Sequence, residues 1–161
     1  MRCKSILHEW IDFPREGNGW SYKYARRQWN LVDNKELCYC YLGDFDKAMI
    51  KIIKSEKNFN KTSVQEIWHN DGDQVLAYMR GDLLFVFNFS PTRSFTDYGF
   101  LVPTGAYSIV LDTDNKEFGG NGLNDDSMTH LTTYDPLYVG DRKEWLKLYL
   151  PARSALVLKK N

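Results

Sequence analysis

Residues 74–89 read QVLAYMRGDLLFVFNF, and this stretch decides the kind of fold that the sequence predicts. Two runs of β-forming residues, 74–80 and 83–89, flank the dipeptide Gly81-Asp82, which is typical of the turn of an antiparallel hairpin. The second run is apolar at every position from Leu83 to Phe87. Such a run favours a strand that is covered on both faces, in the middle of a sheet.

Further strands are predicted on both sides of this hairpin. Residues 66–68 come before it across an Asn-Asp-Gly-Asp turn, so that three strands form a meander. Short β-rich runs also follow, with glycine and proline residues between them, at 106–112, 145–150 and 154–158. About 95 residues should therefore form an antiparallel β domain.

The residues before about position 60 have a different period. An apolar stripe from Leu37 to Ile53, preceded by Asp33 and Glu36 in the form of a capping box, predicts a helix over residues 35–55. A weaker helical pattern begins at Ser21 and ends at Asp33. The first 20 residues have no clear period, and we interpret them as loop.

Composition narrows the possible functions. With 161 residues the chain is too short for a complete TIM barrel, which needs about 250. Its 21 basic and 21 acidic residues form no basic stripe, so we expect no nucleic-acid partner and no membrane partner. No apolar run reaches membrane-spanning length, and the sequence is typical of a cytoplasmic protein. The three cysteines have an odd count and no zinc spacing, so we expect neither a disulfide nor a metal.

Acidic residues gather in two places, and each place has two interpretations. The members are Glu9, Asp12 and Glu16 near the start, and Asp112, Asp114, Glu117, Asp125 and Asp126 later. Paired carboxylates hydrolyse glycosides when they flank a bond at about 5 to 10 Å, but carboxylates are also common in turns. Residues 112–115 begin like a calcium loop but lack its later glycine and glutamate, which favours a hairpin turn with Asx hydrogen bonds.

Aromatic residues near the start suggest another chemistry. The set comprises Trp10, Trp20, Tyr22 and Tyr24 beside the polar residues Asp12, Arg15 and Asn18. Sugar rings present apolar C–H faces that stack on aromatic rings, while polar side chains bind the hydroxyls. The alternative is that these aromatic side chains pack beneath the helices.

The sequence also resembles a known family over residues 9 to 161. The segments that carry the resemblance are Glu9-Trp10-Ile11-Asp12-Phe13-Pro14-Arg15-Glu16-Gly17-Asn18, Tyr22 to Trp29, Phe45-Asp46-Lys47-Ala48-Met49, Gly81 to Phe89, Ile109 to Asp112, Phe118-Gly119-Gly120 and Tyr149-Leu150-Pro151-Ala152-Arg153. In this order they are similar to 1,4-α-glucan (glycogen) branching enzymes of the α-amylase superfamily. Residues 1–7 do not match that family, and residues 125–144 match it loosely.

The resemblance implies a fold and an activity. The fold class is α+β: residues 1–63 would be a loop and helices from the end of a (β/α)8 barrel, and residues 64–161 an all-β antiparallel sandwich of the α-amylase C-terminal type. The family is a glycosyltransferase of glycogen biosynthesis that moves an α-1,4-glucan segment to an α-1,6 position, without a cofactor. Its catalytic carboxylates lie on barrel strands that precede the residues matched here, so the resemblance leaves open whether this chain is itself an enzyme and predicts that it is inactive alone.

The same resemblance suggests binding residues and partners. Trp10, Asp12, Arg15 and Asn18 would lie on the rim of the barrel and bind substrate. The expected partners are an α-glucan such as glycogen or amylose and the barrel domain itself. Two alternatives remain open: a freestanding carbohydrate-binding β module without turnover, and a compact autonomous glycosidase that uses Asp12 or Glu16 with a carboxylate from the β domain.

Overall fold

The computed structural model describes residues 11–25, 31–35, 37–57, 59–134 and 144–161. The chain divides into two compact units, residues 1–46 and residues 47–161, which are described separately. In the first unit, residues 11–25 form a loop around the short 3-10 helix η1 (Glu16–Asn18). The loop predicted for residues 11–20 is therefore confirmed.

The predicted helix from Ser21 is wrong over its first five residues, where the chain forms turns. The amide of Ser21 donates to Oδ1 of Asn18 at 3.3 Å, and the amide of Ala25 donates to the carbonyl of Tyr22 at 3.1 Å. Local bonds of this kind compete with helical bonds. Residues 26–30 lie outside the described part of the chain.

The longer predicted helix is confirmed with a later start. Helix α1 spans Tyr39–Ser55, so its end agrees with the prediction and its beginning lies four residues further on. Before the helix, the amide of Asn34 donates to the carbonyl of Leu31, and the amide of Leu37 donates to the carbonyl of Asn34. Each bond spans three residues and closes a tight turn. The predicted capping box cannot be compared, because Glu36 lies outside the described residues.

The expectation of unpaired cysteines is wrong for Cys38, which is disulfide-bonded. Cys40 keeps a free thiol, which donates to the carbonyl of Leu37. Sequence spacing could not show this pairing, because a disulfide depends on which segments approach one another in three dimensions.

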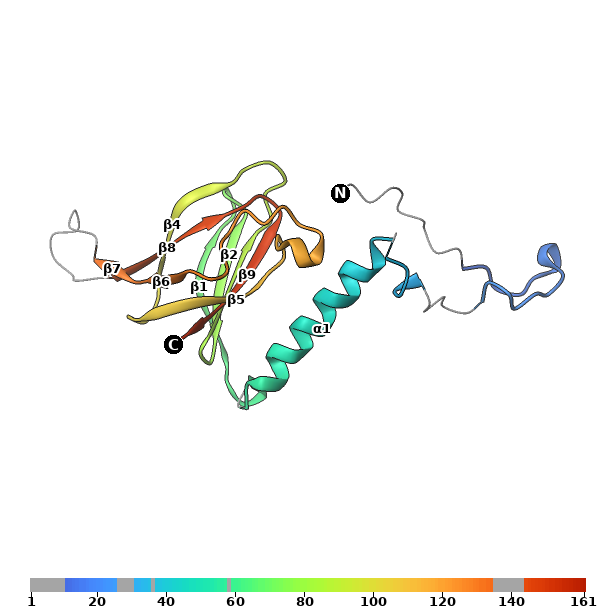
Figure 1. The fold of residues 1–161 in the computed structure, drawn as a ribbon, viewed down its shortest axis with the longest axis horizontal. Coiled ribbons are helices and arrows are strands. Elements are labelled where there is room, and N and C mark those ends of the chain that lie inside the picture. Colours follow the sequence, from blue (N-terminus) through green and yellow to red (C-terminus); the bar gives the residue numbers. More distant parts are fainter. Residues whose placement is uncertain (1–10, 26–30, 36, 58, 135–143) are drawn as a thin grey trace. The chain divides into compact units, whose positions relative to one another are not determined.

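The second unit is a two-layer antiparallel β-sandwich (Figure 1). Its six-stranded sheet has the order β1-β2-β3-β9-β5-β6, and its three-stranded sheet has the order β4-β8-β7. The strands are β1 (Val64–Asn70), β2 (Val75–Arg80), β3 (Leu83–Asn88), β4 (Phe95–Leu101), β5 (Ala106–Asp112), β6 (Thr129–Leu131), β7 (Thr133–Tyr134), β8 (Glu144–Leu150) and β9 (Ser154–Lys160). Short 3-10 helices, η3 (Phe59–Lys61) and η4 (Lys116–Phe118), lie before β1 and after β5.

The predicted hairpin of residues 74–89 is confirmed. Strands β2 and β3 pair from Arg80 with Leu83 to Val75 with Asn88, and β3 pairs on its other edge with β9. The strand β3 is therefore interior to its sheet, as its continuous apolar run predicted. Strands β4, β6 and β7 were not predicted, because β6 and β7 are only three and two residues long and β4 mixes polar with apolar residues.

The core lies between the two sheets. Alternate residues of each strand face inward because side chains alternate along a strand; in β2 these are Val75, Ala77 and Met79, all buried. Phe100 and Leu146 meet them from the three-stranded sheet. The predicted all-β antiparallel sandwich with a preceding loop and helix is confirmed. Among the described residues, no helix has the length and apolarity to cross a bilayer.

Candidate functional site

The predicted polar residues of the first unit form one hydrogen-bonded cluster. Asp12 Oδ1 accepts from Arg15 Nε at 3.0 Å, and Asp12 Oδ2 accepts from Asn18 Nδ2 at 3.1 Å. Asn18 Oδ1 in turn accepts from the Arg15 amide at 3.0 Å. The loop is closed by the amide of Asp12, which donates to the carbonyl of Tyr24 at 3.1 Å. The structure thus brings three of the four predicted binding residues together, and Trp10 lies outside the described residues.

This cluster holds Asp12 in its ionised form. Hydrogen bonds from Arg15 and then from Asn18 lower the pKa of the Asp12 carboxyl below its ordinary value. A carboxylate that keeps its charge accepts hydrogen bonds from hydroxyls but is a poor proton donor. The arrangement therefore suits binding of a polar ligand.

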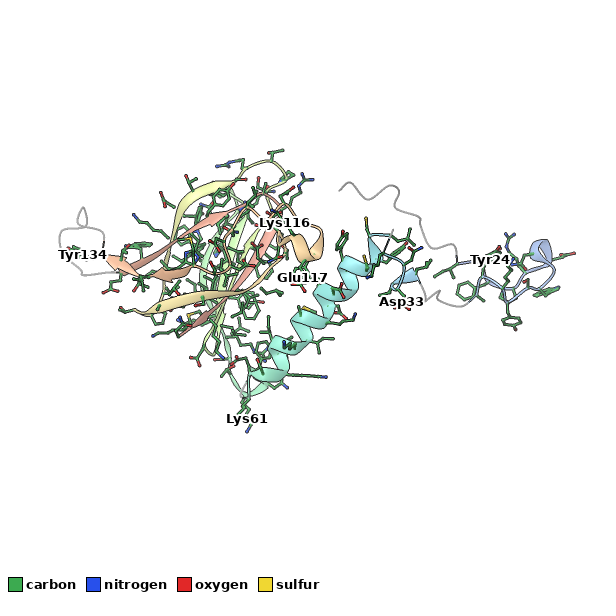
Figure 2. The ribbon with its side chains drawn as sticks, viewed as in Figure 1. Tyr24, Asp33, Lys61, Lys116, Glu117 and Tyr134 are labelled. Carbon is green, nitrogen blue, oxygen red and sulfur yellow. The ribbon has the colours of Figure 1, made fainter. Side chains whose placement is uncertain are left out.

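Aromatic and apolar side chains around the cluster are exposed. Trp20 is 67% exposed and Tyr22 is 73% exposed, whereas Tyr24, labelled in Figure 2, is 40% exposed. Phe13 is 70% exposed on the same loop. Flat apolar rings beside a charged, hydrogen-bonding cluster are the elements of a sugar-binding surface.

The later acidic group forms a structural loop between β5 and β6. Asp112 is 1% exposed, and its Oδ1 accepts from the amide of Asp114 at 2.7 Å. Asp114 Oδ1 accepts from the amide of Asn121, and Asp125 Oδ1 accepts from the amide of Ser127, each at 3.0 Å. Asn115 accepts from the amide of Glu117 at 2.8 Å, and so caps η4. The predicted Asx hydrogen bonds are confirmed, but the predicted hairpin turn is wrong, because residues 113–128 form a long loop that contains η4.

These bonds explain why the acidic loop is a poor catalytic candidate. Burial raises the pKa of Asp112, because a charge is less stable away from water. Both carboxylate oxygens of Asp114 accept hydrogen bonds from the loop: Oδ1 from the amide of Asn121, and Oδ2 from the amide of Leu123 at 3.1 Å. Figure 2 labels Lys116 and Glu117 on the outside of this loop. Among the described residues, no group of three or more histidine, cysteine or acidic side chains is placed to hold a metal ion.

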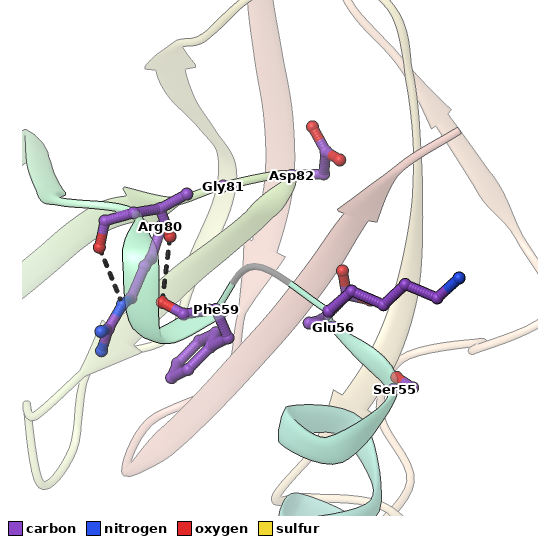
Figure 3. Close-up of a pocket in the computed structure, with 8 residues that line it drawn as sticks. Ser55, Glu56, Phe59, Arg80, Gly81 and Asp82 are labelled. Carbon is purple, nitrogen blue, oxygen red and sulfur yellow. Dashed lines mark hydrogen bonds between the residues drawn. The ribbon is translucent and has the colours of Figure 1, made fainter.

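A pocket of about 420 Å³ lies between the residues that follow α1 and the β2–β3 turn (Figure 3). Arg80 from the end of β2 lies over the ring of Phe59, 4.1 Å from its centroid, and its Nε donates to the carbonyl of Thr62 at 3.3 Å. Glu56, also in the lining, is paired with Lys159. Two charged side chains of its lining, Arg80 and Glu56, therefore have partners within the protein.

Sequence reasoning missed a polar network that ties β1 to β4. Trp68 Nε1 donates to the Tyr98 hydroxyl, which donates to Asp73 Oδ2, both at 3.1 Å. Arg93 Nη2 donates to the other oxygen of Asp73 at 2.9 Å. The four residues are up to 30 positions apart, and no spacing signal in the sequence connects them.

The two-sheet antiparallel β-sandwich places the second unit in a class of all-β domains, which comparison with a family model identifies. Residues 67–161 match the family model of the alpha amylase, C-terminal all-beta domain. This match covers more than half of the chain, which therefore belongs to that family.

Individual relatives identify the chain more narrowly than the domain family does. It is 44% identical over 151 residues to the 1,4-alpha-glucan-branching enzymes of Candida glabrata and Saccharomyces cerevisiae, in each case 93% of this chain and 21% of the relative. The enzyme of the same name from Dictyostelium discoideum is 44% identical over 158 residues, 94% of this chain and 22% of the relative. The predicted resemblance to branching enzymes is confirmed, and the chain spans about a fifth of the length of these relatives.

Proposed function

We propose that this chain serves as the C-terminal part of a 1,4-α-glucan branching enzyme, where it guides the glucan and supplies no catalytic carboxylate. The family match over residues 67–161 and the 44% identity to branching enzymes support this proposal. In it, residues 1–63 complete the barrel domain, residues 64–161 are the C-terminal all-β domain, and the protein works in the cytoplasm. The partners are an α-glucan and the barrel domain.

The observation that carries the glucan-guiding role is the Asp12–Arg15–Asn18 cluster with its exposed rings. Ionised Asp12 accepts hydrogen bonds from sugar hydroxyls, while Arg15, whose side chain is 63% exposed, donates to them. Trp20 and Tyr22 provide the flat surfaces on which sugar rings stack. Trp10 completes this set in the proposal.

A chimaera tests the proposed place of the chain in the enzyme. The matching fifth of the Saccharomyces cerevisiae enzyme is replaced by the 161 residues of this chain, and branching of amylose is followed by the iodine spectrum. We expect the chimaera to branch amylose and the isolated chain to leave the spectrum unchanged. An inactive but folded chimaera would favour a freestanding binding module, and activity of the isolated chain would support the autonomous glycosidase.

The binding residues are tested in the same chimaera. Arg15→Ala removes a hydroxyl donor and leaves the Asp12 carboxylate, so we expect KM for amylose to rise several-fold with little change in kcat. Glu16→Gln, an exposed neighbour in the same loop, serves as the matched control. Equal kinetics of the two variants would remove Arg15 from the proposed site.

A further inference from the structure

A second cavity, of about 310 Å³, lies at one end of the six-stranded sheet. It is lined by the last residues of β3, the first residues of β9 and the residue that follows β5. Phe87 and Phe89 provide its aromatic wall, and Thr113 and Arg153 provide polar groups. Its volume lies at the small end of the range that is usual for ligand pockets, about 300 to 1,000 Å³.

The aromatic wall of this cavity is flat and open to solvent. The rings of Phe87 and Phe89 are nearly parallel, with centroids 5.6 Å apart and an interplanar angle of 4°. Phe89, the residue that follows β3, is 60% exposed. Phe87 stacks in turn on Tyr78 of the neighbouring strand β2, with centroids 5.8 Å apart, so the aromatic stack continues across the sheet. A rigid phenyl surface that faces water offers a stacking platform for a ring-shaped ligand.

The polar groups of the cavity have unused hydrogen-bonding capacity. The guanidinium of Arg153 makes no hydrogen bond or ion pair with any residue that the structure describes, although its amide donates to the carbonyl of Ser90 at 3.0 Å. Thr113 Oγ1 accepts from the amide of Ala155 at 2.8 Å, which leaves its O–H free to donate. No acidic residue lines the cavity. The cavity therefore presents donors beside an apolar platform, which suits a neutral polyhydroxylated ring.

We propose that this cavity is a glucan-binding subsite of the β domain, in which one glucosyl ring of an α-1,4-glucan stacks on Phe89. Arg153 and Thr113 donate hydrogen bonds to its hydroxyls. The choice of an α-glucan as the ligand rests on the proposed function. The existence of the cavity and of its hydrogen-bond donors is independent of that function. The subsite lies in the all-β domain and shares no residue with the loop cluster of Asp12, Arg15 and Asn18.

Binding of maltoheptaose to the complete 161-residue chain tests this subsite. The dissociation constant is measured by calorimetry, and retardation is measured in native gels that contain glycogen. Phe89→Leu keeps an apolar side chain but removes the flat ring, and we expect the dissociation constant to rise about tenfold. Phe89→Trp enlarges the ring and should bind at least as tightly as the wild type, while Arg153→Gln should bind several-fold more weakly.

The matched control is Leu131→Ala, which truncates an equally exposed side chain on β6 of the same sheet. It should bind like the wild type. Thermal melts accompany each variant, and if Phe89→Leu fails to fold, the Phe89→Trp and Arg153→Gln variants decide the outcome. Wild-type binding by Phe89→Leu or by Arg153→Gln, or no binding by the wild-type chain, would overturn the subsite. A change of oligomeric state without a change of glycogen retardation would also overturn it, because the surface would then be a protein contact.

Trp20→Ala separates the failure of the subsite from the failure of the proposed function. If Trp20→Ala abolishes retardation and Phe89→Leu does not, the loop guides the glucan and the subsite is wrong. If only the Phe89→Leu variant loses binding, the subsite stands and the loop has no such role in the isolated chain.

Discussion

The side chain of Asn88 donates a hydrogen bond from Nδ2 to the carbonyl of Leu150 at 3.2 Å, and so joins the ends of β3 and β8 from opposite sheets. The same nitrogen lies 2.9 Å from the carbonyls of Pro151 and Arg93, while Oδ1 accepts from the amide of Ser90 at 3.0 Å. Asn88 is 2% exposed. One buried side-chain amide therefore satisfies backbone carbonyls at the ends of two segments, residues 88–93 and 150–151.

Asn88→Ala should destabilise the chain by about 2 to 3 kcal/mol, because it leaves several buried backbone groups without partners. Urea melts followed by circular dichroism measure the change. Asn161→Ala removes an exposed amide that donates to Ser108 Oγ at 3.0 Å, and it should cost less than about 0.5 kcal/mol. Equal stabilities of the two variants would show that the buried bonds of Asn88 contribute nothing beyond a surface bond.

Gly120→Ala should disrupt the loop between β5 and β6. A Cβ atom at this position would lie 2.1 Å from the carbonyl oxygen of Asp114, a distance that no relaxed structure permits. We expect a loss of about 3 kcal/mol, measured by thermal melting, since the backbone must move to relieve the overlap. At Gly72 the same atom would meet only Asn70 Oδ1 at 3.4 Å, so Gly72→Ala should leave the melting temperature nearly unchanged. A Gly120→Ala variant as stable as that control would contradict the close approach.

Tyr98→Phe should weaken the link between β1 and β4 by about 1 to 2 kcal/mol, because Trp68 and Asp73 each lose a hydrogen-bond partner. Burial first, and the bond to Asp73 in addition, raise the pKa of Tyr98 above its ordinary value of 10.0. The folded chain thus holds this proton more tightly than the unfolded chain. Its contribution to stability is complete below the ordinary pKa and is lost as pH rises through the raised value.

Urea melts at about pH 8 and about pH 11 measure this pH dependence. The stability difference between the wild type and Tyr98→Phe should shrink at the higher pH. Tyr149→Phe is the control, because the Tyr149 hydroxyl makes no hydrogen bond within the described residues, and its difference from the wild type should stay small at both values. A difference for Tyr98→Phe that is constant with pH would show that this hydroxyl does not titrate differently in the two states.

The sequence alone predicted the central hairpin and the positions of six strands along the chain. Alternation in 75–80, the apolar run from Leu83 and the turn at Gly81-Asp82 predict a central hairpin, because side chains alternate between the faces of a strand and only an interior strand is covered on both. The same alternation places Asn88 on the inner face after Leu84 and Val86, a signal of a buried amide that sequence reasoning did not use.

Only the tertiary structure decided which distant polar atoms meet. The bonds of Asn88 to Leu150 and of Tyr98 to Asp73 join segments whose approach depends on the packing of whole sheets and loops. The Asp12 cluster is intermediate: the sequence placed its residues within seven positions, and the fold of the loop turned them toward one another. The period of apolar residues predicts each helix or strand separately. Contacts between distant residues form only when burial of the shared core sets the positions of these elements relative to one another.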